Sequence, residues 1–238
     1  MKILRTLFVL ILISAALFVG FKMYTQDITI PFFNQDKSKT LTLKGSASPL
    51  DVVLYNQMDS PKLYNGCEVT SLAMVLHYAG YNVSKNTLAE NIPTVPLTYS
   101  SGLKGDPNEG FVGDMENGPG LGVYHEPIYK LAKKYAGSDA KDLTGQNIKA
   151  VYRELEQGRP VWVITTSKFA PVDNIETWKT SNGNVDITYS VHSVAVTGYD
   201  EDYVYVNDPY GHKNRKTDRK NFEKAWKQMG SQAIAIEN

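Results

Sequence analysis

Apolar residues recur with helical spacing at Val69, Leu72, Ala73, Leu76 and Ala79. These positions share one face of a helix, because they lie three, four, seven and ten residues after the first. Asn65 or Gly66 can cap the start, Glu68 suits the positive end of the helix dipole, and Gly80 is a typical residue after a helix end. The pattern therefore predicts an amphipathic helix that begins near Cys67.

The remaining pattern predicts short helices followed by antiparallel strands. We expect helices at 85–91, 126–135 and 146–157, and strands at 51–58, 160–166, 187–197, 203–207 and 233–236. The segment 92–122 is rich in Gly and Pro and has no sustained period, so it is predicted to be a loop that borders a cleft. The segment 168–186 is predicted to be irregular. Helices first and antiparallel strands last indicate an α+β fold in one domain.

The first 26 residues have the charged start and apolar run of an export signal. The run 6–21 is not followed by a small-residue cleavage site, which favours an uncleaved N-terminal membrane anchor over a cleaved signal peptide. Residues 27–48 are polar and are expected to form a linker to the domain 49–238. We therefore expect the domain on the extracytoplasmic face of the cell membrane, or secreted.

Charge and motifs exclude several classes of function. Outside the leader, 22 basic residues face 25 acidic ones, which argues against nucleic-acid binding. The basic run 212–220 is interpreted as a solvated loop and helix start. The sequence shows no metal-ligand spacing and no nucleotide-binding loop, so we expect neither metal nor cofactor. The acidic residues of 92–122 do not match a calcium loop and are expected to be solvated: Asp106, Glu109, Asp114 and Glu116.

Cys67 is the one cysteine of the chain. It cannot form an intramolecular disulfide, so it is either an inert core residue or a reactive thiol. Its predicted place at a helix N-terminus favours a reactive thiol, because the helix dipole and a nearby imidazolium both lower a thiol pKa.

A thiol nucleophile needs an imidazole and a third group that orients the imidazole. His192 and Asp208 lie on consecutive predicted strands joined by a tight turn, so they can sit side by side. His125, at a predicted helix start, is the alternative imidazole. His77 lies on the same helix as Cys67 but almost three turns away, too far to reach the thiol.

An oxyanion hole would combine a backbone N–H at the helix start with a side-chain amide. Gln57 is the first candidate for that amide, and Asn56 or Asn65 could supply it instead.

The motifs resemble those of papain-like cysteine peptidases related to bacteriocin-processing peptidases. The similarity lies in YNGCEVTSLAMVLHYAG, GDPNEGFVGD, GLGVYHEPI, HSVAVTGYD and YVYVNDPYG, which span most of 54–236. The resemblance implies a helix-borne nucleophile packed on an antiparallel sheet, with Cys67 as nucleophile, His192 as general base and acid, Asp208 as orienting residue and Gln57 as oxyanion-hole amide. Gln57 stands further from Cys67 than in papain-type enzymes.

The function expected from these observations is an extracytoplasmic cysteine hydrolase that cleaves a peptide or amide bond through a thioester acyl-enzyme. Its partner would be a peptide or peptidoglycan-like substrate, with the membrane reached through the N-terminal segment. Transporter segments do not accompany the motifs, so a double-glycine leader peptide is not implied as substrate. An acyltransferase or amidase with the same triad, and an inactive cell-surface binding module, are the alternatives.

Overall fold

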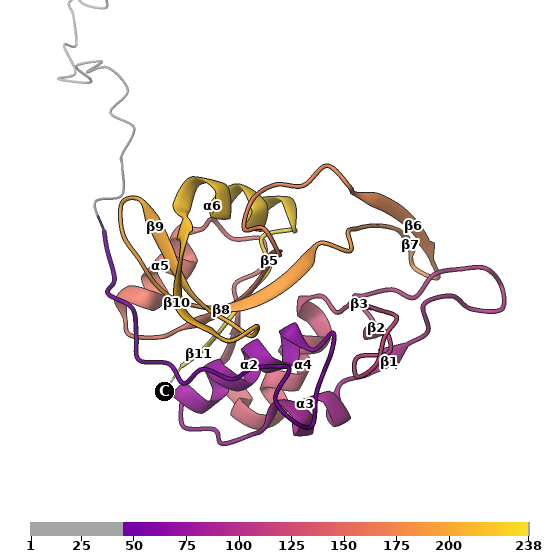
Figure 1. Ribbon diagram of the computed structural model, residues 1–238, viewed down its shortest axis with the longest axis horizontal. Helices are drawn as coiled ribbons and strands as arrows, with labels where there is room; N and C mark the ends of the chain where they lie inside the picture. Colours follow the sequence, from indigo (N-terminus) through magenta and orange to yellow (C-terminus); the bar gives the residue numbers. More distant parts are fainter. Residues whose placement is uncertain (1–44, 238) are drawn as a thin grey trace, which may run out of the picture. The chain divides into compact units, whose positions relative to one another are not determined.

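The centre of the fold is a six-stranded sheet in the order β10-β9-β8-β5-β11-β4, seen in a computed structural model that describes residues 45–237 (Figure 1). Every neighbouring pair of strands is antiparallel. The strands are β4 (Ala140–Asp142), β5 (Val161–Thr166), β8 (Val191–Tyr199), β9 (Tyr203–Asp208), β10 (His212–Asp218) and β11 (Ala233–Ile236). Together with the helices on its faces, this sheet confirms the predicted α+β class.

Helices cover both faces of the sheet (Figure 1). They are α2 (Cys67–Tyr78), α3 (Lys85–Asn91), α4 (His125–Ala136), the 3-10 turn η1 (Gly137–Asp139), α5 (Lys149–Glu156) and α6 (Arg219–Gln228). Trp162 and Ile164 of β5 join the core under α2 and α4, whereas Val161 and Val163 join the core under α5 and α6. This split follows from the alternation of side chains along a strand, and it gives the sheet two separate apolar cores.

Helix α2 begins at Cys67 with Gly66 as its N-cap, as the sequence predicts. Its first ten residues are all buried, because the helix lies between the sheet and its neighbouring helices. The indole Nε1 of Trp162 donates a hydrogen bond to the Glu68 carbonyl at 3.0 Å, and Ser71 Oγ donates to the Ser193 carbonyl at 3.0 Å. These two bonds fix the first turns of α2 on strands β5 and β8.

Two segments predicted without strands contain short ones. The segment 92–122 forms a small sheet of β1 (Thr94–Val95), β2 (Phe111–Gly113) and β3 (Gly120–Gly122), and 168–186 contributes most of a hairpin of β6 (Glu176–Thr180) and β7 (Gly183–Ile187). Gly113 illustrates why these strands could not be recognised in the sequence. Its φ is +94°, and a Cβ there would stand 2.4 Å from the Pro119 carbonyl oxygen. Such close backbone contacts need glycine, and glycine weakens a strand pattern.

The prediction of a strand over 51–58 is wrong. The segment runs beside β9 without a backbone ladder, since the side-chain amide of Asn207 donates to the carbonyls of Val52 at 3.0 Å and Val53 at 3.4 Å. A side chain thus takes the place of a neighbouring strand's N–H groups.

The basic run 212–220 begins with an edge strand and not with a loop. Among the described residues, strand β10 pairs only with β9, and its mostly exposed charged side chains suit a sheet edge that other chains must not extend. Asp218 then caps α6, accepting a hydrogen bond from the Asn221 backbone at 2.8 Å. The predicted helix start is therefore confirmed.

The predicted leader 1–26 and most of the predicted linker 27–48 lie outside the described residues. The last part of that linker is described, and Ala47 exchanges two backbone hydrogen bonds of 2.9 Å with Tyr199 of β8. Between residues 45 and 237, no helix combines the length and the apolar character needed to cross a membrane.

Candidate active site

His192 and Asp208 form a buried pair between strands β8 and β9. His192 Nε2 lies 3.0 Å from Asp208 Oδ1, and each side chain is 2% exposed. The prediction that His192 and Asp208 lie side by side is therefore confirmed. Because Nε2 is engaged by the carboxylate, Nδ1 is the ring nitrogen left to exchange a proton with another group.

Asp208 is held in its ionised form by two further contacts. Its Oδ2 accepts from Arg215 Nη1 at 3.0 Å, and its Oδ1 also accepts from the Tyr210 backbone N–H at 3.1 Å. Burial acts to raise the pKa of Asp208, but the hydrogen bond and charge interaction with His192, together with these donors, outweigh burial and lower that pKa. Asp208 therefore presents a negative charge to the imidazole.

Aromatic side chains fix the imidazole ring of His192 from two sides. Tyr210 stacks on it with ring centroids 5.1 Å apart and planes 16° from parallel, and Phe169 contacts it edge-on at 6.0 Å. The Arg215 guanidinium in turn covers the Phe169 ring at 4.8 Å. Sequence reasoning missed Arg215, which it placed in a solvated basic run.

The Cys67 thiol lies beside the histidine-bearing strand. Its side chain is buried, and the backbone N–H of Ser193, the residue after His192, donates a hydrogen bond to it. The thiol itself donates to Glu68 Oε2 at 3.3 Å. The sulfur thus lies against the strand that bears His192, and its own proton points to Glu68.

The pKa of Cys67 is raised well above its usual value of 9.0. Burial is the main cause, followed by the charge of Glu68 and the hydrogen bond to it, and the charge of Asp208 adds to the effect. Only the Ser193 N–H acts to lower it. The direction is opposite to the one expected from the helix terminus, because the thiol is buried and two carboxylates act on it as well.

Glu68 is a fully buried carboxyl group, and sequence reasoning gave it only a role at the helix dipole. Its Oε1 accepts a hydrogen bond from the Val123 backbone N–H at 3.1 Å. Burial raises its pKa from 4.5 to about 7, although hydrogen bonds from its own N–H, from Cys67 and from Val123 act in the other direction. A Cβ at Gly122 would stand 2.4 Å from Oε1, so a glycine is needed where this carboxyl group packs.

The predicted oxyanion-hole amide is occupied by other bonds. Gln57 is fully buried, and its Nε2 donates to the carbonyls of Leu63 at 3.3 Å and Tyr64 at 2.9 Å. It therefore braces the loop that leads into α2, and its role as oxyanion donor stays a prediction. Asn65 likewise donates to the Asp114 carbonyl at 3.0 Å. Within the described residues, the Cys67 backbone N–H has no hydrogen-bond acceptor.

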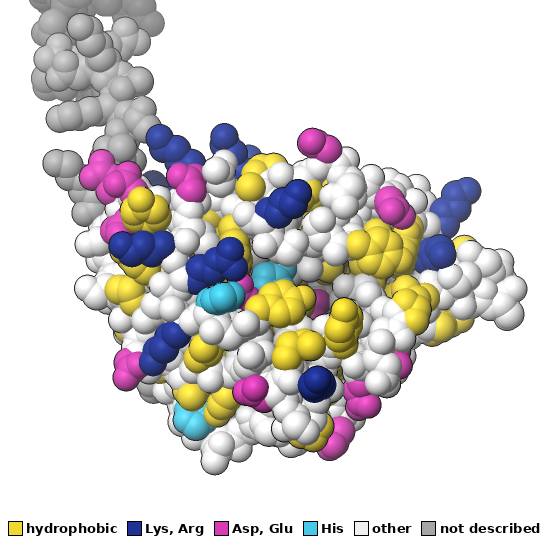
Figure 2. Space-filling model, viewed as in Figure 1, with side chains coloured by type: hydrophobic (Ala, Val, Ile, Leu, Met, Phe, Trp, Pro, Cys, Tyr) yellow, Lys and Arg dark blue, Asp and Glu magenta, His cyan; other side chains and the backbone are white. Residues whose placement is uncertain are grey.

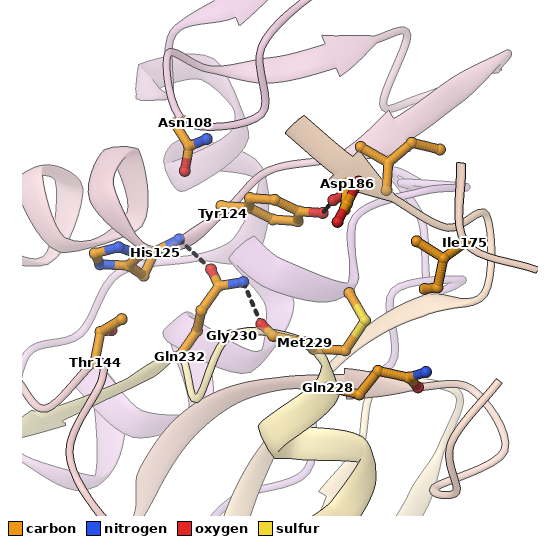
Figure 3. Close-up of a pocket in the computed structure, with 11 residues that line it drawn as sticks. Asn108, Tyr124, His125, Thr144, Ile175, Asp186, Gln228, Met229, Gly230 and Gln232 are labelled. Atoms are coloured by element: carbon orange, nitrogen blue, oxygen red, sulfur yellow. Dashed lines mark hydrogen bonds between the residues drawn. The ribbon is translucent and has the colours of Figure 1, made fainter. Parts of the chain in front are cut away.

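The alternative histidines have other surroundings. His125 pairs with Asp142 at 3.0 Å and donates its backbone N–H to Gln232 Oε1 at 2.8 Å. It lines a pocket of about 440 Å³ whose walls include Tyr124 and Gln232 but neither Cys67 nor the His192–Asp208 pair (Figure 3). His77 accepts or donates a 2.9 Å bond with Tyr55 on the other end of α2. His192 thus stands on the strand that contacts the thiol through Ser193, whereas His125 and His77 are bonded to Asp142 and Tyr55.

Exposed aromatic side chains border the site, one on the segment before Cys67 and one on the segment after Asp208. Tyr64 precedes Cys67 by three residues and is 59% exposed, and Tyr210 follows Asp208 by two and is 51% exposed. Hydrophobic side chains gather in the middle of the face shown in Figure 2, next to a histidine. Such a surface can receive an extended chain or a ring.

The acidic residues of 92–122 are not uniformly solvated. Asp106 is only 4% exposed and accepts hydrogen bonds from Asn108 and Asn182, so the prediction is wrong for this residue. Within 45–237, no three His, Cys, Asp or Glu side chains gather in a way that could hold a metal ion.

A cysteine at a helix start beside a buried His–Asp pair on an antiparallel sheet is the arrangement of papain-like cysteine peptidases. The chain belongs to the Peptidase_C39 like family, whose signature matches residues 49–234. The resemblance inferred from the motifs is confirmed.

The chain is similar to three known proteins. The chain is 68% identical to the uncharacterized protein YvpB of Bacillus subtilis (strain 168) over the whole of both chains. It is 45% identical to a candidate C39-like peptidase from Bacillus anthracis of known crystal structure, covering 82% of this chain and 98% of that one with a TM-score of 0.78. The peptidase domain of Streptococcus ComA, a bifunctional ABC transporter of a quorum-sensing pathway, matches at 16% identity and a TM-score of 0.44, covering 78% of this chain and 98% of that one.

Proposed function

We propose that this protein is an extracytoplasmic cysteine hydrolase that cleaves a peptide or amide bond through a thioester acyl-enzyme. The observation that carries the proposal is the buried His192–Asp208 pair, 3.0 Å apart, beside the Cys67 thiol at the start of α2. Membership of a peptidase family points to the same chemistry. The three residues have the roles of general base, orienting residue and nucleophile.

The reaction begins with transfer of the thiol proton to Nδ1 of His192, since Nε2 is held by Asp208. The Cys67 sulfur forms a bond to the substrate carbonyl carbon, and the carbonyl oxygen becomes an oxyanion. The imidazolium then gives its proton to the leaving amine as the C–N bond breaks, which leaves a thioester on Cys67. A water molecule, deprotonated by His192, hydrolyses the thioester and restores the thiol.

The helix start supplies the donor for the oxyanion. The backbone N–H of Cys67 has no acceptor in the described part of the chain, so it is available to the substrate oxygen. Gln57 is the second donor in our proposal, and this role requires one amide hydrogen to turn from the Leu63 carbonyl, its longer bond at 3.3 Å. Each such donor contributes about 3 kcal/mol to lowering the barrier.

Formation of the thiolate depends on charge balance in a buried site. The raised pKa of Cys67 keeps the free thiol neutral, so the reactive species is the thiolate–imidazolium pair formed by internal proton transfer. Asp208, which is itself paired with Arg215, stabilises the imidazolium with its negative charge. Proton transfer between buried groups avoids release of an uncompensated charge.

The proposed substrate is a peptide or a peptidoglycan-like chain. Support comes from the exposed Tyr64 and Tyr210, which border the thiol and offer aromatic faces to a chain. The charged and apolar leader supports attachment to the cell membrane on its outer face, or secretion. The acidic balance of the domain does not favour nucleic acid.

A library of peptides with a carbon electrophile at the scissile position tests the proposal. We expect covalent labelling of wild-type protein at Cys67 and no labelling of Cys67→Ala. Matched amide substrates then distinguish hydrolysis from transfer, because an added amine that captures the acyl group in place of water would show an acyltransferase. A Cys67 thiol that reacts with iodoacetamide at pH 6 no faster than free cysteine would contradict a hydrolase and favour a binding module.

A further inference from the structure

The carboxyl group of Glu68 is enclosed by Val123, Cys67 and Gly122. Oε1 accepts from the Val123 N–H at 3.1 Å, Oε2 accepts from the Cys67 thiol at 3.3 Å, and Gly122 leaves the space that Oε1 fills. The residue is fully buried, and within the described residues it forms no ion pair. A buried carboxylate without a cation is costly, so a structural role alone does not account for it.

The hydrogen bond from Cys67 competes with the chemistry proposed for the thiol. As long as Oε2 is a carboxylate oxygen, it accepts the thiol proton that His192 must receive. A negative charge at this position also opposes formation of a thiolate. When Glu68 is protonated, it no longer repels the sulfur and its O–H can donate a hydrogen bond to the thiolate.

We propose that Glu68 is a protonation-controlled latch on the nucleophile: the carboxylate holds Cys67 as a neutral thiol turned away from His192, and the protonated acid releases the thiol to His192. This inference rests on the proposed function and adds a regulation of the same site. In the closed state the S–H bond is intact and points to Oε2. Opening adds one proton from solvent to Glu68, after which the thiol proton moves to Nδ1 of His192.

The groups that face the latch come from several elements. Cys67 faces it from α2 itself, and the phenols of Tyr124 and Tyr210 lie within electrostatic reach of Glu68. The charge of Asp208, which is paired with His192, also acts on the sulfur. Burial brings the pKa of Glu68 to about 7, and both phenol pKa values are raised, so the carboxyl group changes charge near neutrality while the phenols remain neutral.

The latch predicts an uncommon pH dependence of thiol reactivity. Relative to free cysteine, the wild-type thiol reacts fast at pH 6, where Glu68 is largely protonated, and loses reactivity as the pH rises through 7. An ordinary thiol does the reverse, because its thiolate fraction grows tenfold with each pH unit below its pKa.

The test is the rate of Cys67 alkylation by iodoacetamide between pH 5 and 9. Glu68→Gln keeps the size of the side chain and cannot become charged, so we expect it to react at least tenfold faster than wild type at pH 8 and within about twofold of it at pH 6. Glu116→Gln, which removes the same charge from an exposed residue near the site, is the control and should follow the wild type. A thermal melt establishes that each variant is folded.

Each outcome decides between explanations. A wild-type rate that rises with the ordinary thiol slope through pH 7 overturns the latch without any variant. A Glu68→Gln protein that loses reactivity at every pH also overturns it, since Glu68 would then be a base that takes the thiol proton. If the latch profile is present but no electrophilic peptide or amide substrate is turned over, the proposed function fails and the latch stands.

Discussion

His192 Nε2 and Asp208 Oδ1 are 3.0 Å apart in a position that solvent barely reaches, each side chain being 2% exposed. Their strands pair through Ala195 and Asn207, three residues after His192 and one before Asp208, so the contact depends on the irregular register of β8 and β9. The hydrogen bond between Nε2 and Asp208 leaves the other imidazole nitrogen free to exchange a proton. That nitrogen, Nδ1, is the acceptor of the thiol proton in the proposed mechanism.

Replacing Asp208 with Asn should leave the fold intact and slow turnover. The neutral amide keeps the size of the side chain but no longer stabilises an imidazolium, and we expect kcat to fall on the order of 10²-fold or more. The measurement is hydrolysis of the best library substrate with a thermal melt beside it. Asp202→Asn, an exposed residue in the turn between β8 and β9, serves as the control. Equal loss in both variants would contradict a role specific to Asp208.

Arg215 should act on the same carboxylate more weakly than Asp208 acts on His192. Its side chain is 44% exposed and its Nη1 lies 3.0 Å from Asp208 Oδ2, so solvent screens much of the interaction. We expect Arg215→Ala to reduce kcat about tenfold, and Arg215→Lys to restore part of the loss because a positive charge returns without the paired geometry. An unchanged kcat with a raised KM would instead assign Arg215 to substrate binding.

Tyr210 should matter through its ring and not through its hydroxyl group. The ring stacks on His192 at 5.1 Å, which restricts the imidazole and shields one of its faces. We expect Tyr210→Phe to keep near wild-type turnover and Tyr210→Ala to lose roughly tenfold, a size in line with a lost aromatic contact of about 1 kcal/mol. Loss of activity in the Phe variant would show that the phenol itself takes part.

The stability of the Glu68→Gln variant should depend on pH in a defined direction. The pKa of Glu68 is about 7 in the folded protein and has an ordinary value of 4.5. The folded state therefore binds more protons between these values, and the wild type loses stability as the pH rises from about 4.5 to 7. The Gln variant avoids this loss. Urea unfolding at pH 4 and pH 8 should show a relative gain for the variant on the order of 3 kcal/mol at the higher pH. A difference independent of pH would contradict the raised pKa.

Trp162 should stabilise the start of α2. Its indole donates to the Glu68 carbonyl at 3.0 Å in a fully buried position. We expect Trp162→Phe to cost about 1–3 kcal/mol in urea unfolding, because the carbonyl loses a buried partner. Trp178→Phe is the matched control, since its indole bonds to Glu176, whose strand position is exposed and open to water. A larger loss for Trp178 would contradict this explanation.

Helices and strands could be predicted from the sequence where the spacing of apolar residues and the capping residues agree. The helix that begins at Cys67, the short helix after Ser84 and the last strand 233–236 have the predicted bounds or start, because spacing, caps and apolar content point the same way. The hairpin β6–β7 was missed because polar residues fill its exposed positions. The strand expected over 51–58 fails because the side chain of Asn207, 155 residues beyond Val52, satisfies its carbonyls.

The candidate site likewise contains some features that the sequence predicts and others that it does not. The placement of His192 and Asp208 on consecutive predicted strands was sufficient to predict that these two side chains meet. The environment of Cys67 was not predictable, because Glu68 is buried by Gly122 and Val123, far away in the sequence. Because Gly122 has no side chain, the sequence gives no sign that it makes room for the Glu68 carboxyl group. The rise in the pKa of Cys67 was missed because neither the burial of the thiol nor the nearness of the Glu68 carboxylate can be read from the sequence.

The most direct test of the central claim is the rate at which iodoacetamide labels Cys67 at pH 6 in the wild type and in His192→Ala. We predict that the wild-type thiol reacts at least tenfold faster than free cysteine and that the histidine variant loses this advantage, with both proteins folded. Equal rates in the two proteins, at or below the rate of free cysteine, would show that the imidazole does not activate the sulfur and would contradict the proposed mechanism.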